Sequence, residues 1–159
     1  IWKDTKVDAC FVDATGGFGS GWIDRLRELN LSPIGVEFAG APNDKRYANK
    51  RAEMWFELAQ WVKEGGCLPN VAELVGELTV PTYTFKGDAL LMEPKELVKK
   101  RLGRSPDLAD GLVLTKAFPA VKQPTDAMVR ALESAMGHQG HSQWGRDPEG
   151  PGVDWLGGM

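Results

Sequence analysis

The sequence lacks the features that mark membrane proteins, secreted proteins and general nucleic-acid binders. Among its 159 residues no apolar run reaches the roughly 18 residues that a membrane span needs, and no secretory signal is visible. Only two cysteines are present, Cys10 and Cys67, and they do not form a CxxC pair, which favours a reduced, cytoplasmic setting without a disulfide framework. The formal net charge of −3 argues against a domain that is basic throughout and leaves room only for local basic patches.

Two further absences concern the organisation of the chain. It begins with Ile1 rather than methionine, which predicts that it is a piece of a longer protein. It contains no G-x-x-x-x-G-K-[ST] motif, so no ATPase motor is expected. The length and the hydrophobic content of 42% fit one globular domain with a proper core. We expect that core in residues 1–121, followed over 122–159 by a helix at 125–136 and a flexible tail rich in glycine and proline.

The first part of the chain predicts a β-α-β unit. Residues 9–12 form a continuous apolar run that ends in Asp13, which is typical of a strand buried on both faces. A glycine-rich turn over 16–21 precedes apolar residues at helical spacing from Trp22 to Leu29, and residues 34–38 read as a second strand. An α/β fold with a parallel pair of strands follows from this order.

The rest of the core region predicts four helices and one hairpin. The helices are expected over 48–62, over 70–78 with Asn70 as N-cap, over 94–103, and over 106–117 with Ser105 as N-cap. The hairpin is expected to pair an extended segment within 79–85 with residues 89–92. We expect Trp22, Trp55 and Trp61 to lie in the core.

Three carboxylates are candidates for a metal site. Asp13 ends a buried strand, at the edge of the sheet where open α/β folds place their active sites. Asp107 and Asp110 lie three residues apart at the start of a helix and therefore share one face. Converged carboxylates are hard oxygen ligands suited to Mg²⁺ or Mn²⁺, and two such ions can activate water at a phosphodiester. The spacing alone is equally compatible with a loop-starting acid and with acids favoured by the helix dipole.

The glycine turn and the basic residues allow other interpretations. The order strand, glycine turn, helix and strand, followed by Glu37, is also that of a dinucleotide-binding unit, although Gly16, Gly19 and Gly21 do not give G-x-G-x-x-G. Basic residues that could contact DNA phosphates form two groups, and charge runs of this kind are also common on solvated helix faces. The groups are Lys45, Arg46, Lys50 and Arg51 at the start of one helix, and Lys95, Lys99, Lys100, Arg101 and Arg104 before the acid pair.

Three segments, in this order, resemble the nuclease domain of phage terminase large subunits. They are FVDATGGFGSG at 11–21, NKRAEMW at 49–55, and Lys95 followed by RSPDLADGL at 104–112. Together they extend over most of residues 7–117. The resemblance implies a ribonuclease-H-like mixed sheet flanked by helices, shared with Holliday-junction resolvases and integrases.

The resemblance also implies a function. It implies an endonuclease with two divalent metals, Mg²⁺ or Mn²⁺, that cuts concatemeric double-stranded DNA during genome packaging in the host cytoplasm. Asp13 and Asp110 would be the catalytic metal ligands, with Asp107 as a third ligand or a water-orienting group, and Lys95 would contact phosphate or balance the acids. The full-length protein would act with the portal protein and the small terminase subunit.

The chain departs from the family pattern in ways that keep other hypotheses open. Family members open with a strand that carries the first catalytic acid, and no such segment precedes Asp13, so we expect this fragment to lack the first strands, to bind metal weakly and to cut poorly. Gly111 stands where the family has alanine. The alternatives are a nucleotide-binding module that uses the turn from Gly16 to Gly21, and a non-catalytic fragment that docks on the portal.

Overall fold

The computed structural model describes residues 7–120 together with Met128 and Arg130. Contacts divide the chain into two compact units, Ile1–Val121 and Lys122–Met159, and every helix and strand named below lies in the first unit. The helix expected over 125–136 lies outside the described residues apart from Met128 and Arg130, which are helical, and the expected tail lies outside them entirely. In the described part of the chain, no helix has the length and apolar character that crossing a membrane requires.

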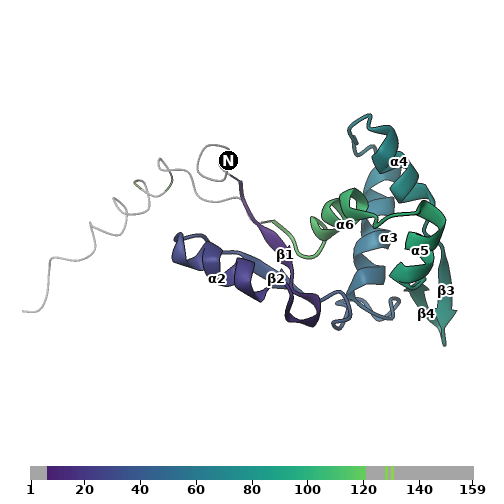
Figure 1. The fold of residues 1–159 in the computed structure, drawn as a ribbon, viewed down its shortest axis with the longest axis horizontal. Helices are drawn as coiled ribbons and strands as arrows, with labels where there is room; N and C mark the ends of the chain where they lie inside the picture. Colours follow the sequence, from purple (N-terminus) through teal and green to yellow (C-terminus); the bar gives the residue numbers. More distant parts are fainter. Residues whose placement is uncertain (1–6, 121–127, 129, 131–159) are drawn as a thin grey trace, which may run out of the picture. The chain divides into compact units, whose positions relative to one another are not determined.

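The predicted β-α-β unit is present. Strands β1 (Phe11–Asp13) and β2 (Ile34–Val36) pair in parallel, with Asp13 opposite Val36. The 3₁₀ turn η1 (Thr15–Gly17) and helix α2 (Ser20–Glu28) connect the two strands, and α2 contacts β2 (Figure 1). Strand β2 is shorter than expected because the Phe38 N–H donates to Thr15 Oγ1 (3.1 Å) instead of to a neighbouring strand.

The middle of the chain forms a long helix, a short helix and a hairpin. Helix α3 (Lys50–Lys63) begins at Asn49, whose side chain accepts from the Ala52 N–H at 2.9 Å. Helix α4 (Ala72–Thr79) begins after Val71 without a side-chain cap, so the prediction of Asn70 as N-cap was wrong. Strands β3 (Tyr83–Lys86) and β4 (Ala89–Met92) form the predicted antiparallel hairpin.

Two short helices complete the described core. Helix α5 (Lys95–Leu102) ends at Gly103, whose φ of 72° is the left-handed conformation that glycine adopts most readily at helix ends. Helix α6 (Asp107–Leu114) has Pro106 at its N-cap position and no side-chain cap. The predicted cap at Ser105 was therefore wrong, and the helix ends three residues before the expected Ala117.

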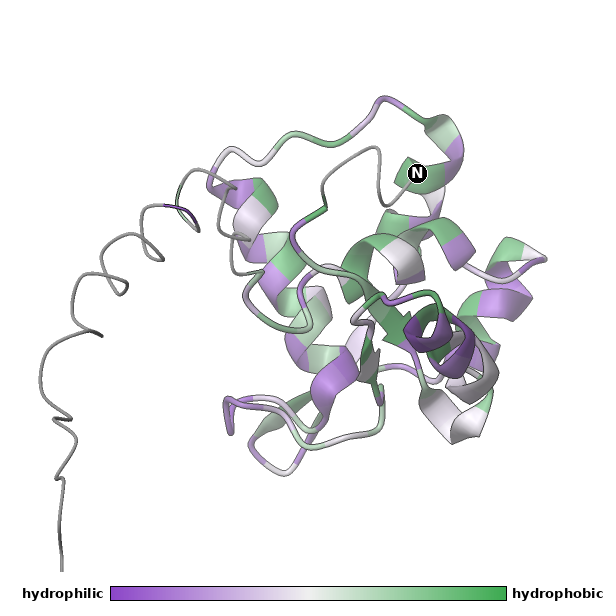
Figure 2. Cartoon of the chain, turned by 90° about the vertical axis from the view of Figure 1, so that its left-hand side faces the viewer, coloured by the Kyte–Doolittle hydropathy of each residue, from purple (hydrophilic) through white to green (hydrophobic). Residues whose placement is uncertain are grey.

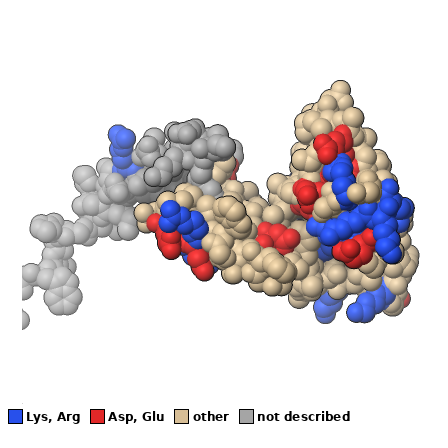
Figure 3. All heavy atoms as spheres, viewed as in Figure 1, with Lys and Arg blue, Asp and Glu red and all other residues tan. Residues whose placement is uncertain are grey.

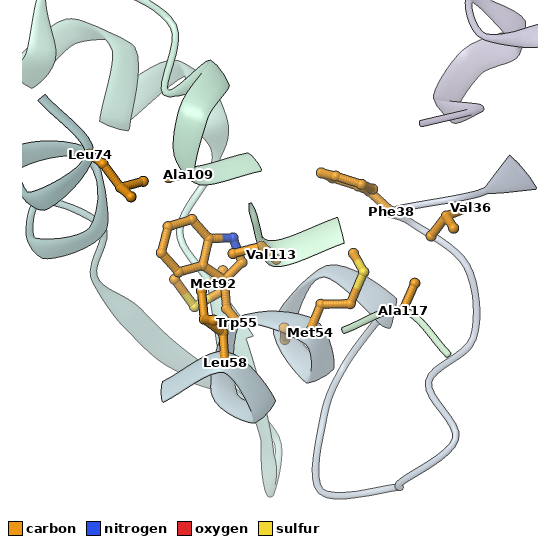
Figure 4. Packing of buried hydrophobic residues seen from close by; sticks show 11 residues of the cluster. Val36, Phe38, Met54, Trp55, Leu58, Leu74, Met92, Ala109, Val113 and Ala117 are labelled. Carbon is orange, nitrogen blue, oxygen red and sulfur yellow. The ribbon is translucent and has the colours of Figure 1, made fainter. Parts of the chain in front are cut away.

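The hydrophobic core joins α3, α4, α6 and β4, with contributions from β2 and from single residues after β2 and after α6. It consists of Val36, Phe38, Ala52, Met54, Trp55, Leu58, Leu74, Met92, Ala109, Val113 and Ala117, most of which Figure 4 labels. Each large apolar side chain buried here stabilises the fold by about 1.5–3 kcal/mol. In Figure 2 the helices alternate between hydrophobic and hydrophilic residues along their length, as expected when only one side of each helix packs inward.

The three tryptophans predicted for the core have different environments. Trp55 is buried, with 7% of its surface exposed, so that prediction is confirmed. Trp61 packs only partly against the core, and Trp22 is 71% exposed, so the prediction for Trp22 was wrong. Helix α2 lies beside a sheet of two strands and buries only Ile23 fully, because a sheet this narrow covers one narrow stripe of a helix.

Candidate functional site

Asp13 lies where the sequence places it, at the carboxyl end of β1. Its side chain is exposed, and Oδ1 accepts a hydrogen bond from the Thr15 N–H at 2.9 Å. The second oxygen, Oδ2, has no hydrogen-bond partner among the residues described. One oxygen therefore fixes the side chain against the turn while the other stays available to a ligand.

The glycine turn packs closely against the backbone of Asp13. A Cβ atom at Gly19 would lie 2.0 Å from the Asp13 carbonyl oxygen, a distance that no real side chain tolerates. The same turn is tied to the segment after β2, because Thr15 Oγ1 accepts from the Phe38 N–H. The close approach of the backbone accounts for a glycine at position 19 without a bound nucleotide.

Asp110 has a very different environment from Asp13. It lies in the first turn of α6 and only 8% of its surface is exposed. Lys95 Nζ lies 2.5 Å from Asp110 Oδ2, which makes an ion pair but lacks hydrogen-bond geometry, and Oδ1 has no hydrogen-bond partner among the described residues. A buried carboxylate is unfavourable unless its oxygens are paired, so Asp110 has capacity for a further cation or donor.

Lys95 connects the surroundings of the two acids. Its side chain contacts Asp110, and it also lines a pocket of about 460 Å³ that Asp13 borders. The pocket is lined by Asp13, Thr15, Gly16, Phe18, Phe38, Lys95, Glu96 and Lys99. Helix α6 contacts β1, so the elements that carry the two acids are in direct contact. The structure thus brings β1 and α6 into contact, whereas a shared metal between the carboxylates of Asp13 and Asp110 stays a prediction.

Asp107, the third predicted ligand, does not complete a group of three acids with Asp13 and Asp110. Asp107 is the first residue of α6 and its side chain is exposed. The described residues contain no group of three or more histidine, cysteine, aspartate or glutamate side chains positioned to hold one metal ion. The assignment of Asp107 as a ligand therefore stays a prediction.

The two basic residues at the start of α3, Lys50 and Arg51, are buried, which removes them from the set that DNA could reach in this structure. Lys50 is 4% exposed and its Nζ lies 2.5 Å from Glu53 Oε2. Arg51 is 9% exposed and donates from Nη1 to the Glu93 carbonyl at 2.6 Å. Charge alone suggested a phosphate contact, but the first turn of α3 faces inward, and both side chains hold neighbouring segments together.

Arg51 also has unused hydrogen-bonding capacity next to the site. Its Nε and Nη2 groups are buried and have no partner among the described residues. Burial lowers the pKa of Arg51, while the negative charges of Asp110 and Glu93 oppose that shift. Arg51 therefore contributes positive charge to the surroundings of Asp110 from the side of α3.

The basic residues of α5 and the following loop form a surface group, which Figure 3 shows as a blue patch in the region of α5. Most of them have acidic partners within the chain. Lys99 Nζ lies 3.3 Å from Glu96, Arg101 pairs with Glu93, and Arg104 pairs with Glu73 and Glu77. Lys100 is exposed and has no ion pair among the described residues.

Comparison with known proteins gives a likeness in structure alone. No protein-family model matches the chain, and no curated protein matches it. The solved nuclease domain of the large terminase subunit gp2 of bacterial virus Sf6 is 21% identical, with a TM-score of 0.58, over 75% of this chain and 69% of that one. Lysine-to-alanine variants of that domain, solved with manganese and with calcium, are each 20% identical over 74% of this chain, with the same TM-score.

The described part of the chain has a mixed α/β fold of the ribonuclease-H-like type, with one small parallel and one small antiparallel sheet. More narrowly, its fold is similar to that of the terminase nuclease domain, which confirms at the level of fold the resemblance suggested by segments 11–21, 49–55 and 104–112.

Proposed function

We propose that the chain is the larger part of a divalent-metal-dependent endonuclease that cuts concatemeric double-stranded viral DNA during genome packaging. The observation that carries the proposal is the position of Lys95, which lines the pocket bordered by Asp13 and at the same time forms an ion pair with Asp110. The likeness to the gp2 nuclease domain supports the same class of chemistry.

The residues present suit a hard divalent cation. Asp110 has a buried oxygen without a partner, and Asp13 has an exposed oxygen without one among the described residues. Carboxylate oxygens are the ligands that Mg²⁺ and Mn²⁺ prefer. Asp13 and Asp110 would hold the metal, with Asp107 as a third ligand or a water-orienting group, and a pair of ions is the arrangement we favour.

The reaction is hydrolysis of a phosphodiester, in which water adds to phosphorus and the bond to the leaving oxygen breaks. Bound divalent ions supply Lewis acidity and lower the pKa of bound water. The protein's own contribution is to orient the acidic side chains and to hold them in the arrangement that the metal ions require. Lys95, a third exposed, would balance the charge of Asp110 and, because it also lines the pocket, would contact the scissile phosphate there.

DNA would be held by the basic residues of α5 and the following loop. Lys99 lines the pocket, and Lys100 is exposed beside it in sequence. Arg101 and Arg104 are partly exposed but already paired with glutamates, so we assign them weaker phosphate contacts. Contacts of this kind position the duplex without reading its sequence.

The wider biological setting follows from the same proposal. The chain would act as the nuclease part of a large terminase subunit, with residues 1–121 as the nuclease core and residues 122–159 as a C-terminal extension. Its partners would be double-stranded DNA and, through the full-length protein, the portal protein and the small terminase subunit. It would work in the host cytoplasm during phage assembly.

The test is cleavage of supercoiled plasmid in Mn²⁺, combined with calorimetric titration of Mn²⁺. We expect weak cutting by the wild-type chain, which Asp13→Ala and Asp110→Ala abolish, while Asp107→Ala reduces it. Glu28→Ala is the matched control, because Glu28 is an exposed acid at the C-terminal end of α2 and, among the described residues, pairs with Arg25. Undiminished Mn²⁺ binding in both Asp13→Ala and Asp110→Ala would contradict the proposal, and tight binding of ATP or NAD would favour a nucleotide-binding module instead.

A further inference from the structure

Helix α6, which carries Asp110, begins without a local cap. Its N-cap residue is Pro106, which has no side-chain acceptor. The first N–H groups of a helix have no partner within the helix, and a buried helix start needs acceptors from elsewhere. Ala109 is fully buried, so its N–H group cannot turn to bulk water.

The acceptor comes from another helix. Glu77 of α4, 32 residues earlier in the chain, places Oε2 at 2.8 Å from the Ala109 nitrogen and accepts its hydrogen bond. Glu77 is itself fully buried, with 0% exposure. A carboxylate at a helix start also interacts favourably with the helix dipole.

The charge of Glu77 is balanced by Arg104. Arg104 Nη1 donates to Glu77 Oε1, and Arg104 Nη2 lies 2.9 Å from Glu73. A buried carboxylate is a costlier acceptor than a local serine cap, but Ser105, one residue before the N-cap position, provides no such cap. The first turn of α6 is thus tied to α4 by a long-range ionic cap, which gives Glu77 a role in placing that turn.

That role is suggested by the residue next to Ala109. Asp110 follows directly in the chain, and its own N–H donates to the Pro106 carbonyl at 2.9 Å. The turn that carries the Asp110 side chain is therefore held by Glu77 at one residue and by Pro106 at the next. We propose that Glu77 is a positioning residue for Asp110, fixing the first turn of α6 so that the carboxylate faces a divalent cation. This inference rests on the proposed function.

The test compares Glu77 with a buried glutamate of the same kind whose hydrogen bonds and ion pair go to residues outside α6. Glu53 accepts from the N–H groups of Asn43 and Asp44 and pairs with Lys50, so Glu53→Gln and Glu53→Met match Glu77→Gln and Glu77→Met. Mn²⁺ affinity is measured by calorimetry on the 159-residue chain, at a temperature where circular dichroism shows each variant folded. Amide exchange at Ala109 and Asp110 is measured on the metal-free chain.

We expect Glu77→Met to weaken Mn²⁺ binding about tenfold, at the low end of the 10- to 100-fold range typical of residues that orient metal ligands. Glu77→Gln keeps one acceptor and should weaken binding by a smaller factor, about threefold. Both should speed amide exchange at Ala109 and Asp110, whereas the Glu53 variants should leave affinity within about twofold and exchange at α6 unchanged. If Glu77→Met does not fold, the comparison of Glu77→Gln with Glu53→Gln tests the inference.

Two results overturn the inference. One is equal loss of Mn²⁺ affinity in the Glu77 and Glu53 pairs, which would make Glu77 a general contributor to stability. The other is faster exchange at Ala109 with unchanged affinity, which would make it a helix cap only. If Asp110→Asn abolishes Mn²⁺ binding while Glu77→Met leaves it unaffected, the positioning role of Glu77 is rejected and the proposed function is not. A wild-type chain that binds no Mn²⁺ rejects the proposed function as well.

Discussion

Lys95 of α5 and Asp110 of α6 form an ion pair of 2.5 Å between Nζ and Oδ2, in which the lysine is a third exposed and the aspartate is nearly buried. The pair is asymmetric, because water can solvate the lysine far better than the carboxylate. Removal of Lys95 should therefore leave the Asp110 carboxylate poorly stabilised, whereas removal of Asp110 leaves a lysine that water can still solvate.

Lys95→Met should destabilise the metal-free chain by about 1–2 kcal/mol, less than for a fully buried pair, because the lysine is partly solvated. Saturating Mn²⁺ should recover part of this loss by supplying positive charge at Asp110. Urea unfolding with and without Mn²⁺ measures both effects. Lys99→Met is the control, since its pair with Glu96 is largely exposed. A Lys95→Met chain as stable as Lys99→Met would rule out a stabilising role for the ion pair.

Gly19→Ala should destabilise the chain by about 1–3 kcal/mol, because the new Cβ would collide with the Asp13 carbonyl oxygen. It should also weaken Mn²⁺ binding by displacing Asp13. Gly21→Ala is the matched control in the same segment, since nothing lies within 4 Å of its Cβ, and it should stabilise α2 by up to about 1 kcal/mol. Thermal unfolding and Mn²⁺ calorimetry check the pair, and equal stability of the two variants would contradict the close packing.

Gly111→Ala should stabilise the chain by about 1 kcal/mol, the usual gain from replacing glycine within a helix. No atom lies within 4 Å of the position its Cβ would take. Gly66→Ala is the contrasting variant, because its Cβ would lie 2.4 Å from the Trp61 ring. The urea midpoint should rise in Gly111→Ala and fall in Gly66→Ala. A lower midpoint in Gly111→Ala would show that α6 needs flexibility at this position.

Glu93 should make the stability of the chain depend on pH. Its hydrogen bond from the Arg101 side chain lowers the pKa of Glu93, with a further contribution from the Thr82 N–H. Because the pKa is lower in the folded than in the unfolded chain, the stabilisation is present above the unfolded value of about 4.3 and is lost as pH falls through the folded value.

Glu93→Gln keeps an acceptor for Thr82 but removes the charge, so its urea midpoint should be lower than wild type at pH 7. The difference should shrink as pH falls below about 4. Glu96→Gln, an exposed acid of α5, should show little difference at either pH. A gap between Glu93→Gln and wild type that stays constant from pH 7 to pH 3 would exclude the ionic contribution.

Local patterns in the sequence predicted most of the fold. The strand that ends at Asp13, the hairpin around Gly87 and the end of α5 at Gly103 depend on neighbours in the chain, and all three are present, although β1 is half-buried and not buried on both faces as expected. The caps expected at Asn70 and Ser105 were wrong. For α6 the reason is long-range, since the acceptor is Glu77 and no window around residue 106 contains it.

The site was predictable in part for the same reason. Asp13 and Asp110 could be chosen because each lies at the end of a recognisable element, and Lys95 because it precedes the acid pair in the resembling segment. The burial of Lys50 and Arg51 could not be foreseen from charge, which does not tell which side of α3 faces inward. Glu77 did leave a signal, because it is an acid three residues after the buried Leu74, on the apolar side of α4.

The link between Glu77 and Arg104 crosses 27 positions of the chain and joins a fully buried acid to its counter-charge. Loss of either partner alone leaves an unbalanced charge, whereas simultaneous replacement of both by neutral side chains does not. Across related sequences, these two positions should therefore substitute together, and such paired changes would trace the inheritance of this helix arrangement even where overall sequence similarity has disappeared.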